Sequence, residues 1–264
     1  MSSRKYPQRI VCMTEESVEL LYLLGQQDRI VGVSCYVERP PQAKSDNVVI
    51  SSFLKANMKR IRELRPDLIL GFSDIQKEIA RDLIAEGFNV WIANHRGLEE
   101  VLDYCLALGS AVGCRDETLR LIQRYESKLS EVCERAKKLK TFPKVYIEEW
   151  NGPYITGIRY FSDLVTACGG HDIFRDRSLG VLAQDRFIEP SEVVERDPDI
   201  ILGCWCGKKV EKESFKARDG WDRISAIQDD RVFELDPAIF LQPGPALFEE
   251  GLDTLMSLFE NNFA

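Results

Sequence analysis

The feature that most constrains the fold is a long helical segment near the middle of the chain, at residues 116–139. It contains neither glycine nor proline. Its apolar side chains recur at close to helical spacing, at Leu119, Ile122, Tyr125, Leu129, Val132 and Ala136. A helix of about 24 residues spans about 36 Å, roughly the width of a small domain. Such a helix divides the 264-residue chain into two halves.

Each half alternates strand-like and helix-like segments, the pattern typical of parallel sheets with crossover helices. In the first half we expect strands at 10–13, 29–34, 68–71 and 89–93, and helices at 15–24, 58–64, 74–86 and 98–112. In the second half we expect strands at 144–149, 200–203 and 232–235, and helices at 160–168, 190–196 and 245–261. The sequence therefore predicts an α/β fold of two Rossmann-like lobes, 1–115 and 143–264, joined by one connecting helix at 116–142.

Charge and cysteine content limit the partners and the setting. The net charge of −8 disfavours nucleic acid as a partner. No segment approaches the roughly 20 apolar residues of a membrane span, and the first residues do not resemble a signal peptide. Eight cysteines lie without the spacing of a disulfide framework, which favours a cytoplasmic protein without direct membrane insertion. A mature chain whose leader has been removed would instead be periplasmic or extracellular.

Several short stretches, weak singly, together resemble a known family in their order and spacing. They are TEESVELL (14–21), GVSCY (32–36) followed by Pro40 and Pro41, RPDLIL (65–70), EWNGPY (149–154), ACGG (167–170), DPDII (197–201) and LQPGP (241–245). The chain is similar to the helix-hinged, or class III, substrate-binding proteins for cobalamin and iron–siderophore complexes, in its cobalamin-binding branch. The resemblance runs from about residue 9 to residue 259.

The resemblance implies a binding protein for a cobalamin-like corrinoid or a metal chelate, held in a cleft between the lobes. It implies an ABC-importer permease as partner, or else an intracellular carrier role, in a monomer that requires no cofactor of its own. Family members dock to the permease through an acidic residue on each lobe. Glu78 lies near the first such position, and Glu211 or Glu213 near the second.

Candidate ligand-binding residues follow from the expected sheets, because ligands of open α/β sheets lie beyond the carboxyl ends of the strands. Aromatic side chains gather in these loops, where they would bury a large flat ligand, and Arg159 is the best candidate for binding an anionic group. The predicted residues are Cys35, Tyr36, Phe53, Phe72, Ser73, Trp150, Tyr154, Arg159, Tyr160, Trp205, Cys206, Phe240 and Gln242.

Catalytic and metal sites find little support in the sequence. It has no G-x-S-x-G elbow, no P-loop and no H-E-x-x-H motif, so we expect no catalytic residues. The C-x-C pair Cys204 and Cys206 lacks histidines at ligand spacing, so we expect no zinc site. The alternative that stays open is a cytoplasmic enzyme or sensor on the same fold, using the cleft thiols Cys35 or Cys206 with His95.

Overall fold

The computed structural model describes residues 6–264, which form two compact units. The N-terminal lobe contains the chain up to His95 together with Glu99–Arg124. The C-terminal lobe contains Arg96–Leu98 and Tyr125–Ala264. The three residues Arg96–Leu98 thus pack with the second lobe although the chain on either side of them belongs to the first. Both lobes are α/β, as predicted.

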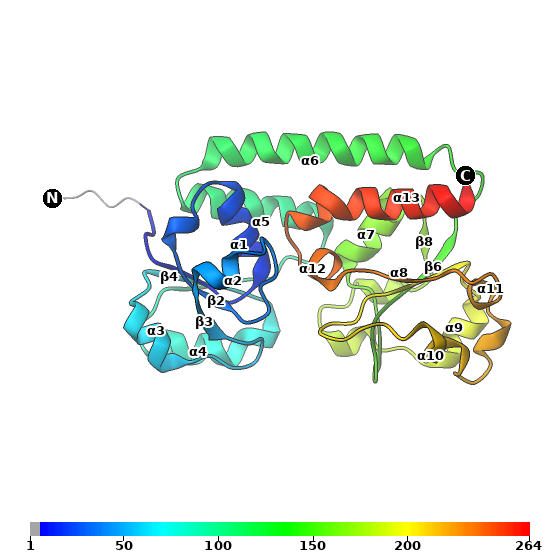
Figure 1. The fold of residues 1–264 in the computed structure, drawn as a ribbon, viewed down its shortest axis with the longest axis horizontal. Coiled ribbons are helices and arrows are strands. Elements are labelled where there is room, and N and C mark those ends of the chain that lie inside the picture. Colours follow the sequence, from blue (N-terminus) through cyan, green and yellow to red (C-terminus); the bar gives the residue numbers. More distant parts are fainter. Residues whose placement is uncertain (1–5) are drawn as a thin grey trace. The chain divides into compact units, whose positions relative to one another are not determined.

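The N-terminal lobe is built on a five-stranded parallel sheet in the order β3-β2-β1-β4-β5. Figure 1 labels β2, β3 and β4 of this sheet. The strands are β1 (Ile10–Cys12), β2 (Ile30–Ser34), β3 (Val48–Ser51), β4 (Leu68–Phe72) and β5 (Val90–Ala93). Val11 and Ile69 are fully buried in neighbouring strands, as expected of a parallel sheet covered on both faces. β3 falls where the sequence predicted a loop running into a helix, so the edge strand was missed.

Helices cover this sheet at close to the predicted places. They are α1 (Glu15–Leu23), α2 (Ala43–Asp46), α3 (Met58–Leu64), α4 (Lys77–Ala85) and α5 (Leu98–Ala111), with short turns η1 (Gln27–Arg29) and η2 (Asp74–Gln76). α3 ends at Leu64 because Arg65 precedes Pro66 and takes a left-handed conformation, with φ of 47°. The predicted helix at 74–86 is split, because η2 forms its first turn and α4 only the remainder.

The C-terminal lobe has a mixed sheet in the order β10-β9-β6-β7, with β8 also paired to β6. Its strands are β6 (Lys144–Asn151), β7 (Tyr154–Thr156), β8 (His171–Asp172), β9 (Ile200–Gly203) and β10 (Val232–Glu234). The pairings of β10 with β9 and of β6 with β8 and β9 are parallel, as predicted, whereas β7, a strand that the sequence did not reveal, runs antiparallel to β6. Only Gly152 and Pro153 separate the two strands, and so short a connection can join only antiparallel strands.

Three helices of this lobe lie close to predicted ones, namely α7 (Arg159–Ala167), α9 (Pro190–Arg196) and α13 (Leu252–Phe263). The sequence did not reveal the short helices α8 (Arg175–Ser178), α10 (Lys212–Lys216), α11 (Ser225–Gln228) and α12 (Pro237–Phe240), or the turns η3 (Ala183–Arg186) and η4 (Trp221–Arg223). The predicted terminal helix at 245–261 opens instead with a π-helical turn, η5 (Leu247–Gly251), before α13 begins.

The long helix predicted from the sequence is α6 (Arg115–Ala136). It is uninterrupted, with Arg124 in the N-terminal lobe and Tyr125 in the C-terminal lobe. It ends three residues earlier than predicted, because Lys138 and Leu139 make tighter turn bonds to the carbonyls of Arg135 and Ala136. Across residues 6–264, no helix is both long enough and apolar enough to cross a membrane.

Candidate functional site

In the N-terminal lobe, two aromatic side chains lie together where β2 and β3 end. Tyr36 follows β2 and stacks on Phe53, with 4.5 Å between ring centroids and 12° between ring planes. Tyr36 is 44% exposed, and Cys35 beside it is half-buried. The Cys35 backbone N–H donates to the Ser51 carbonyl at 2.8 Å, which joins the ends of the two strands. The structure therefore brings three predicted residues together.

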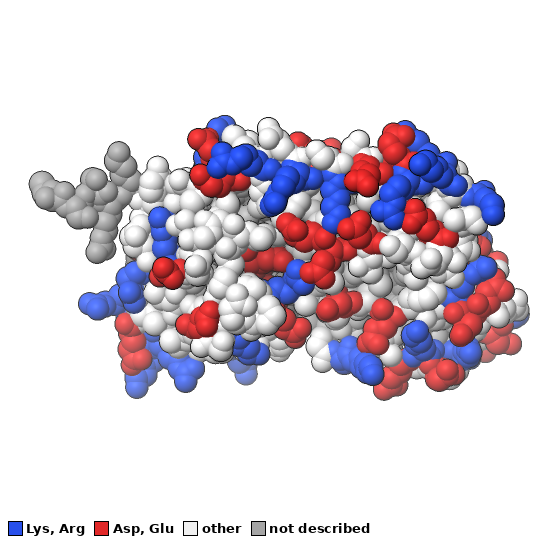
Figure 2. Space-filling model, turned by 45° about the horizontal axis from the view of Figure 1, so that its top comes forward, with Lys and Arg blue, Asp and Glu red and all other residues white. Residues whose placement is uncertain are grey.

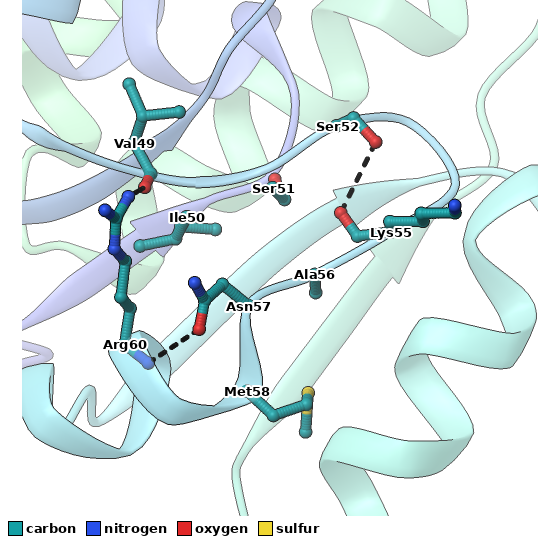
Figure 3. Close-up of a pocket in the computed structure, with 9 residues that line it drawn as sticks. All are labelled: Val49, Ile50, Ser51, Ser52, Lys55, Ala56, Asn57, Met58 and Arg60. Atoms are coloured by element: carbon teal, nitrogen blue, oxygen red, sulfur yellow. Dashed lines mark hydrogen bonds between the residues drawn. The ribbon is translucent and has the colours of Figure 1, made fainter.

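The loop that carries Phe53 is a tight turn beside an open pocket (Figure 3). The Ser52 N–H donates to the Lys55 carbonyl at 2.8 Å, and the Arg60 guanidinium donates to the Val49 carbonyl, also at 2.8 Å. Figure 3 shows the residues that line the pocket, which are Val49, Ile50, Ser51, Ser52, Lys55, Ala56, Asn57, Met58 and Arg60. These bonds hold the turn in place and so fix the backbone on which Phe53 is presented.

Phe72 and Ser73 follow β4, as predicted. Phe72 is half-buried and meets the ring of His95 edge-on, at 5.0 Å between centroids. Ser73 is buried and has φ of 61° and ψ of 178°, a strained combination for any residue but glycine. Its N–H donates to the Ala93 carbonyl at 2.7 Å, and its hydroxyl accepts from the Ile75 N–H at 3.4 Å. Ser73 thus shapes the turn, and its contact with a ligand stays a prediction.

Two buried carboxyl groups at the start of α1 were missed by the sequence interpretation. Glu15 and Glu16 are 2% and 1% exposed and follow directly after β1. Burial raises the pKa of Glu15 to about 8 and that of Glu16 to about 7. Glu15 accepts a hydrogen bond from the Glu38 N–H at 2.8 Å, and Glu16 accepts one from the Thr14 hydroxyl at 2.5 Å. An acidic pair at a helix start resembles an ordinary exposed first turn, so nothing in the sequence signalled burial.

In the C-terminal lobe, the predicted residues Trp150 and Tyr154 belong to the β6–β7 hairpin. They lie on strands rather than in a loop, and both are half-buried against the core of this lobe. The Trp150 indole N–H donates to the Gly152 carbonyl at 3.0 Å, which fixes the ring next to the hairpin turn.

Trp205 and Cys206 follow β9, and the structure corrects the prediction for Trp205. This indole is 2% exposed, stacks on Phe215 at 5.9 Å and donates to Glu148 at 3.1 Å. It is therefore a core residue here, because its N–H finds a buried acceptor.

The two thiols of the C-x-C pair do not share a face, because Cys206 is exposed whereas Cys204 is buried. Burial raises the pKa of Cys204. Within the described part of the chain, no group of three or more His, Cys, Asp or Glu residues could hold a metal ion.

A buried ion pair lies beneath these aromatic rings. Glu148 is fully buried and accepts two hydrogen bonds from the Arg218 guanidinium, at 2.6 and 2.9 Å. The Arg218 guanidinium also lies over the rings of Tyr154, Phe215 and Trp221, within 4.8 Å of each centroid. The sequence interpretation passed over both partners, because a glutamate inside a strand and an arginine after a short helix carry no motif.

The remaining predicted residues of this lobe divide between core and surface. Tyr160 is 3% exposed and Phe240 is fully buried against Phe161, so the expected ligand contact is corrected for both rings. Burial raises the pKa of the Tyr160 phenol. Arg159 opens α7, half-exposed and 4.0 Å from the Asp163 carboxylate, and Gln242 is half-buried. These last two keep polar groups at the surface.

The two predicted docking residues are both exposed. Glu78 lies in the first turn of α4 and forms an ion pair with Arg81 at 2.5 Å. Glu211 directly precedes α10. Docking by either residue stays a prediction.

Comparison with known proteins identifies the family. The family model described as periplasmic binding protein matches residues 10–239, which is most of the chain. The chain belongs to the periplasmic binding protein family. Its members are substrate-binding proteins, in agreement with the resemblance noted in the sequence, and the enzyme alternative finds no support.

Individual relatives align over 79–98% of the chain. An ABC transporter substrate-binding lipoprotein of Bacillus subtilis is 26% identical, covering 98% of this chain and 82% of the relative. The vitamin B12-binding protein of Pectobacterium atrosepticum is 25% identical, covering 79% and 76%. The Staphylococcus aureus IsdE structure complexed with heme superposes with a TM-score of 0.80 at 23% identity, over 95% of this chain and 98% of that one. The last of these establishes the shared fold.

Proposed function

We propose that this periplasmic binding protein binds a metal tetrapyrrole, with a cobalamin-like corrinoid as the first candidate, and delivers it to an ABC-importer permease. One observation carries the proposal: where strands β2 and β3 of the N-terminal lobe end, the exposed ring of Tyr36 stacks on the half-buried ring of Phe53. A relative that is a vitamin B12-binding protein supports the choice of ligand.

The chemistry of the aromatic residues suits a large flat ligand. An aromatic side chain contributes roughly 150–250 Å² of buried area. The ring of Tyr36 is 44% exposed and is held in place by stacking on Phe53. Trp150 and Tyr154 offer a second aromatic surface in the C-terminal lobe, each half-buried. The metal complex would be the transported cargo, and we propose that the protein needs no resident cofactor.

The importer role also sets the proposed location and partner. The related Bacillus protein is a substrate-binding lipoprotein, and we infer that this chain acts on the outer side of the cytoplasmic membrane, in place of the cytoplasmic setting expected from its cysteines. A monomer would meet the permease through exposed acidic residues, for which Glu78 and Glu211 are the candidates.

The first prediction tests the ligand. Isothermal titration calorimetry with cyanocobalamin, hydroxocobalamin and hemin should detect binding of at least one of them by the purified protein. Replacing both Tyr36 and Phe53 by alanine should weaken that binding by at least about tenfold, because the ligand loses its stacking surface. The control is Phe142→Ala, which removes a 63% exposed ring. Phe142 precedes β6 and so lies at the amino end of that strand, whereas the predicted ligand-binding residues lie near the carboxyl ends of the strands.

Two outcomes would contradict the proposal. Absence of binding to all three compounds would exclude these tetrapyrroles as ligands. An equal affinity for the wild type and the Tyr36/Phe53 double variant would remove the stacked pair from the site.

A further inference from the structure

Lys208 holds its charge against the aromatic surface of the C-terminal lobe. Its ammonium lies 4.2 Å from the centroid of the Trp150 ring and 4.6 Å from that of the Trp205 ring. It also donates a hydrogen bond to the Asn151 side-chain oxygen, next to Trp150 on the hairpin. An exposed side chain from the loop after β9 is thereby held on two indole faces.

The charge of Lys208 is not neutralised, in contrast to that of Arg218. Arg218 donates both of its terminal nitrogens to the buried Glu148 carboxylate. For Lys208, residues 6–264 supply no carboxylate within ion-pair distance, and its hydrogen-bond acceptor is a neutral amide oxygen. A positive charge is thus available at the surface of an acidic protein with a net charge of −8.

Lys208 also lies next to a cluster of packed aromatic rings. The Trp205 ring packs on Phe215 with 17° between ring planes, and the guanidinium of Arg218 lies 4.1 Å from the Phe215 centroid. Trp205 is buried, so the ring that a flat ligand could reach is the half-buried Trp150, and the ammonium of Lys208 lies over that ring. Any ligand that stacks there must displace the ammonium, and the displacement costs its contacts with both indoles and with Asn151.

We propose that Lys208 determines specificity by selecting tetrapyrroles that carry a carboxylate at the rim of the ring. The ring of the ligand replaces the ammonium on the indole face of Trp150, and the displaced ammonium pairs with the carboxylate. An acid-bearing ligand thereby compensates for the contacts that it breaks, whereas an esterified ligand does not. The inference rests on the proposed function, since it assumes that a tetrapyrrole binds to this lobe, and within that class it places acid-bearing rings ahead of cobalamins, whose rim carries amides.

The test uses two ligands that share the corrin ring and differ at its rim, dicyanocobyrinic acid with seven carboxyl groups and its heptamethyl ester with none. The wild type should bind the acid more tightly. Lys208→Met keeps the aliphatic stem and loses the charge, so it should bind the acid about three- to tenfold more weakly and the ester about two- to fivefold more tightly. Lys208→Arg should restore the preference for the acid, and Lys209→Met, an equal loss of charge at the next exposed position, should leave the ratio of the two affinities unchanged.

The outcomes separate this inference from the proposed function. If the wild type and Lys208→Met bind both corrins with the same ratio of affinities, Lys208 does not select and the inference is overturned, while the proposed function stands. If Lys209→Met changes the ratio as much as Lys208→Met does, the effect is one of net charge, which also overturns it. If neither cobalamins, hemin nor these corrins bind to the wild type, the proposed function fails and the inference fails with it.

Discussion

At the scale of single residues, Glu15 shows how far burial can change a carboxyl group. Its side chain is 2% exposed, and its pKa is raised to about 8 chiefly by that burial, with further contributions from the nearby acids Glu19, Glu38 and Glu16. One hydrogen bond from the Glu38 N–H acts in the opposite direction. In the unfolded chain the same carboxyl titrates near pH 4.3, so the folded protein holds the proton more tightly than the unfolded chain does.

This difference predicts a pH dependence of stability with a definite sign. Between the unfolded pKa and about pH 8, the folded state binds more protons, so the contribution of Glu15 to the free energy of unfolding is largest in acid and falls as the pH rises. Glu15→Gln keeps an acceptor for the Glu38 N–H but does not titrate. Relative to this variant, the wild type should lose about 1–3 kcal/mol between pH 5 and pH 8, as measured by urea unfolding.

The control is Glu99→Gln, which removes an exposed acid at the start of α5 and should leave the pH profile parallel to that of the wild type. Parallel profiles for the wild type and Glu15→Gln would show that the carboxyl is ionised at neutral pH in the folded protein.

Single residues also show which parts of the site could not be predicted from the sequence. Of the aromatic side chains predicted to face a ligand after strands, Tyr36 is exposed and stacks on Phe53, whereas Trp205 and Phe240 are buried in the core. Neither residue type nor position relative to the strand distinguishes the exposed ring from the buried ones. Trp205 is buried because a distant glutamate accepts its N–H, and such a partner, 57 residues away in the sequence, cannot be inferred from local pattern.

At the scale of elements, the C-terminal half of α6 is attached to α13 by charged side chains. Arg135 donates to Glu260 at 2.7 Å, and Lys128 pairs with Asp253, also at 2.7 Å. Figure 2 shows Lys and Arg side chains along α6, with Asp and Glu side chains interspersed beside them. A connected set of ion pairs contributes more than isolated surface pairs do, and its contribution falls with added salt.

We expect Arg135→Met to lower the free energy of unfolding by about 1 kcal/mol at low ionic strength. The methionine keeps most of the apolar stem, so the loss reports on charge. In 1 M NaCl, where the screening length is about 3 Å, the difference from the wild type should largely disappear. Arg120→Met is the matched control, because Arg120 lies on the same helix in an exposed pair with Glu117. A loss for Arg135→Met that persists in high salt would assign its role to packing instead.

Elements differ in how well the sequence predicts them, and the difference lies in how much of their signal is local. α6 and α9 were predicted within a few residues because their periodicity, or a proline at the first helical position, defines them locally. β3, β7 and β8 were missed, and short length alone does not explain this, because β1 and β10 have only three residues each and were predicted. β3 forms by pairing with β2, and β7 and β8 form by pairing with β6. β7 also decides the placement of Tyr154, so the missed hairpin displaced part of the predicted site from a loop to a strand.

At the scale of the whole molecule, one helix belongs to both lobes. α6 passes from the N-terminal to the C-terminal lobe between Arg124 and Tyr125 without a glycine, a proline or a break. Bending a helix in mid-course breaks backbone hydrogen bonds, so a continuous helix resists large changes of angle. The length of this helix was predicted from sequence because it depends on local pattern, whereas the division of its residues between the lobes depends on packing.

The continuity of α6 predicts a small conformational response to ligand. The radius of gyration measured by small-angle X-ray scattering should be the same, within error, before and after ligand is added to the wild type. Replacing Arg124 and Glu126 by glycine, both exposed residues beside the boundary, weakens the helix by about 1 kcal/mol per position. This variant should sample a wider range of lobe orientations, so its radius of gyration should fall measurably when ligand binds.

The control places glycines at Glu117 and Arg120, which are exposed positions of the same helix away from the boundary. They should leave the response as in the wild type, because the helix there lies within the N-terminal lobe. A large decrease for the wild type itself would show that the lobes move by another route than bending of α6.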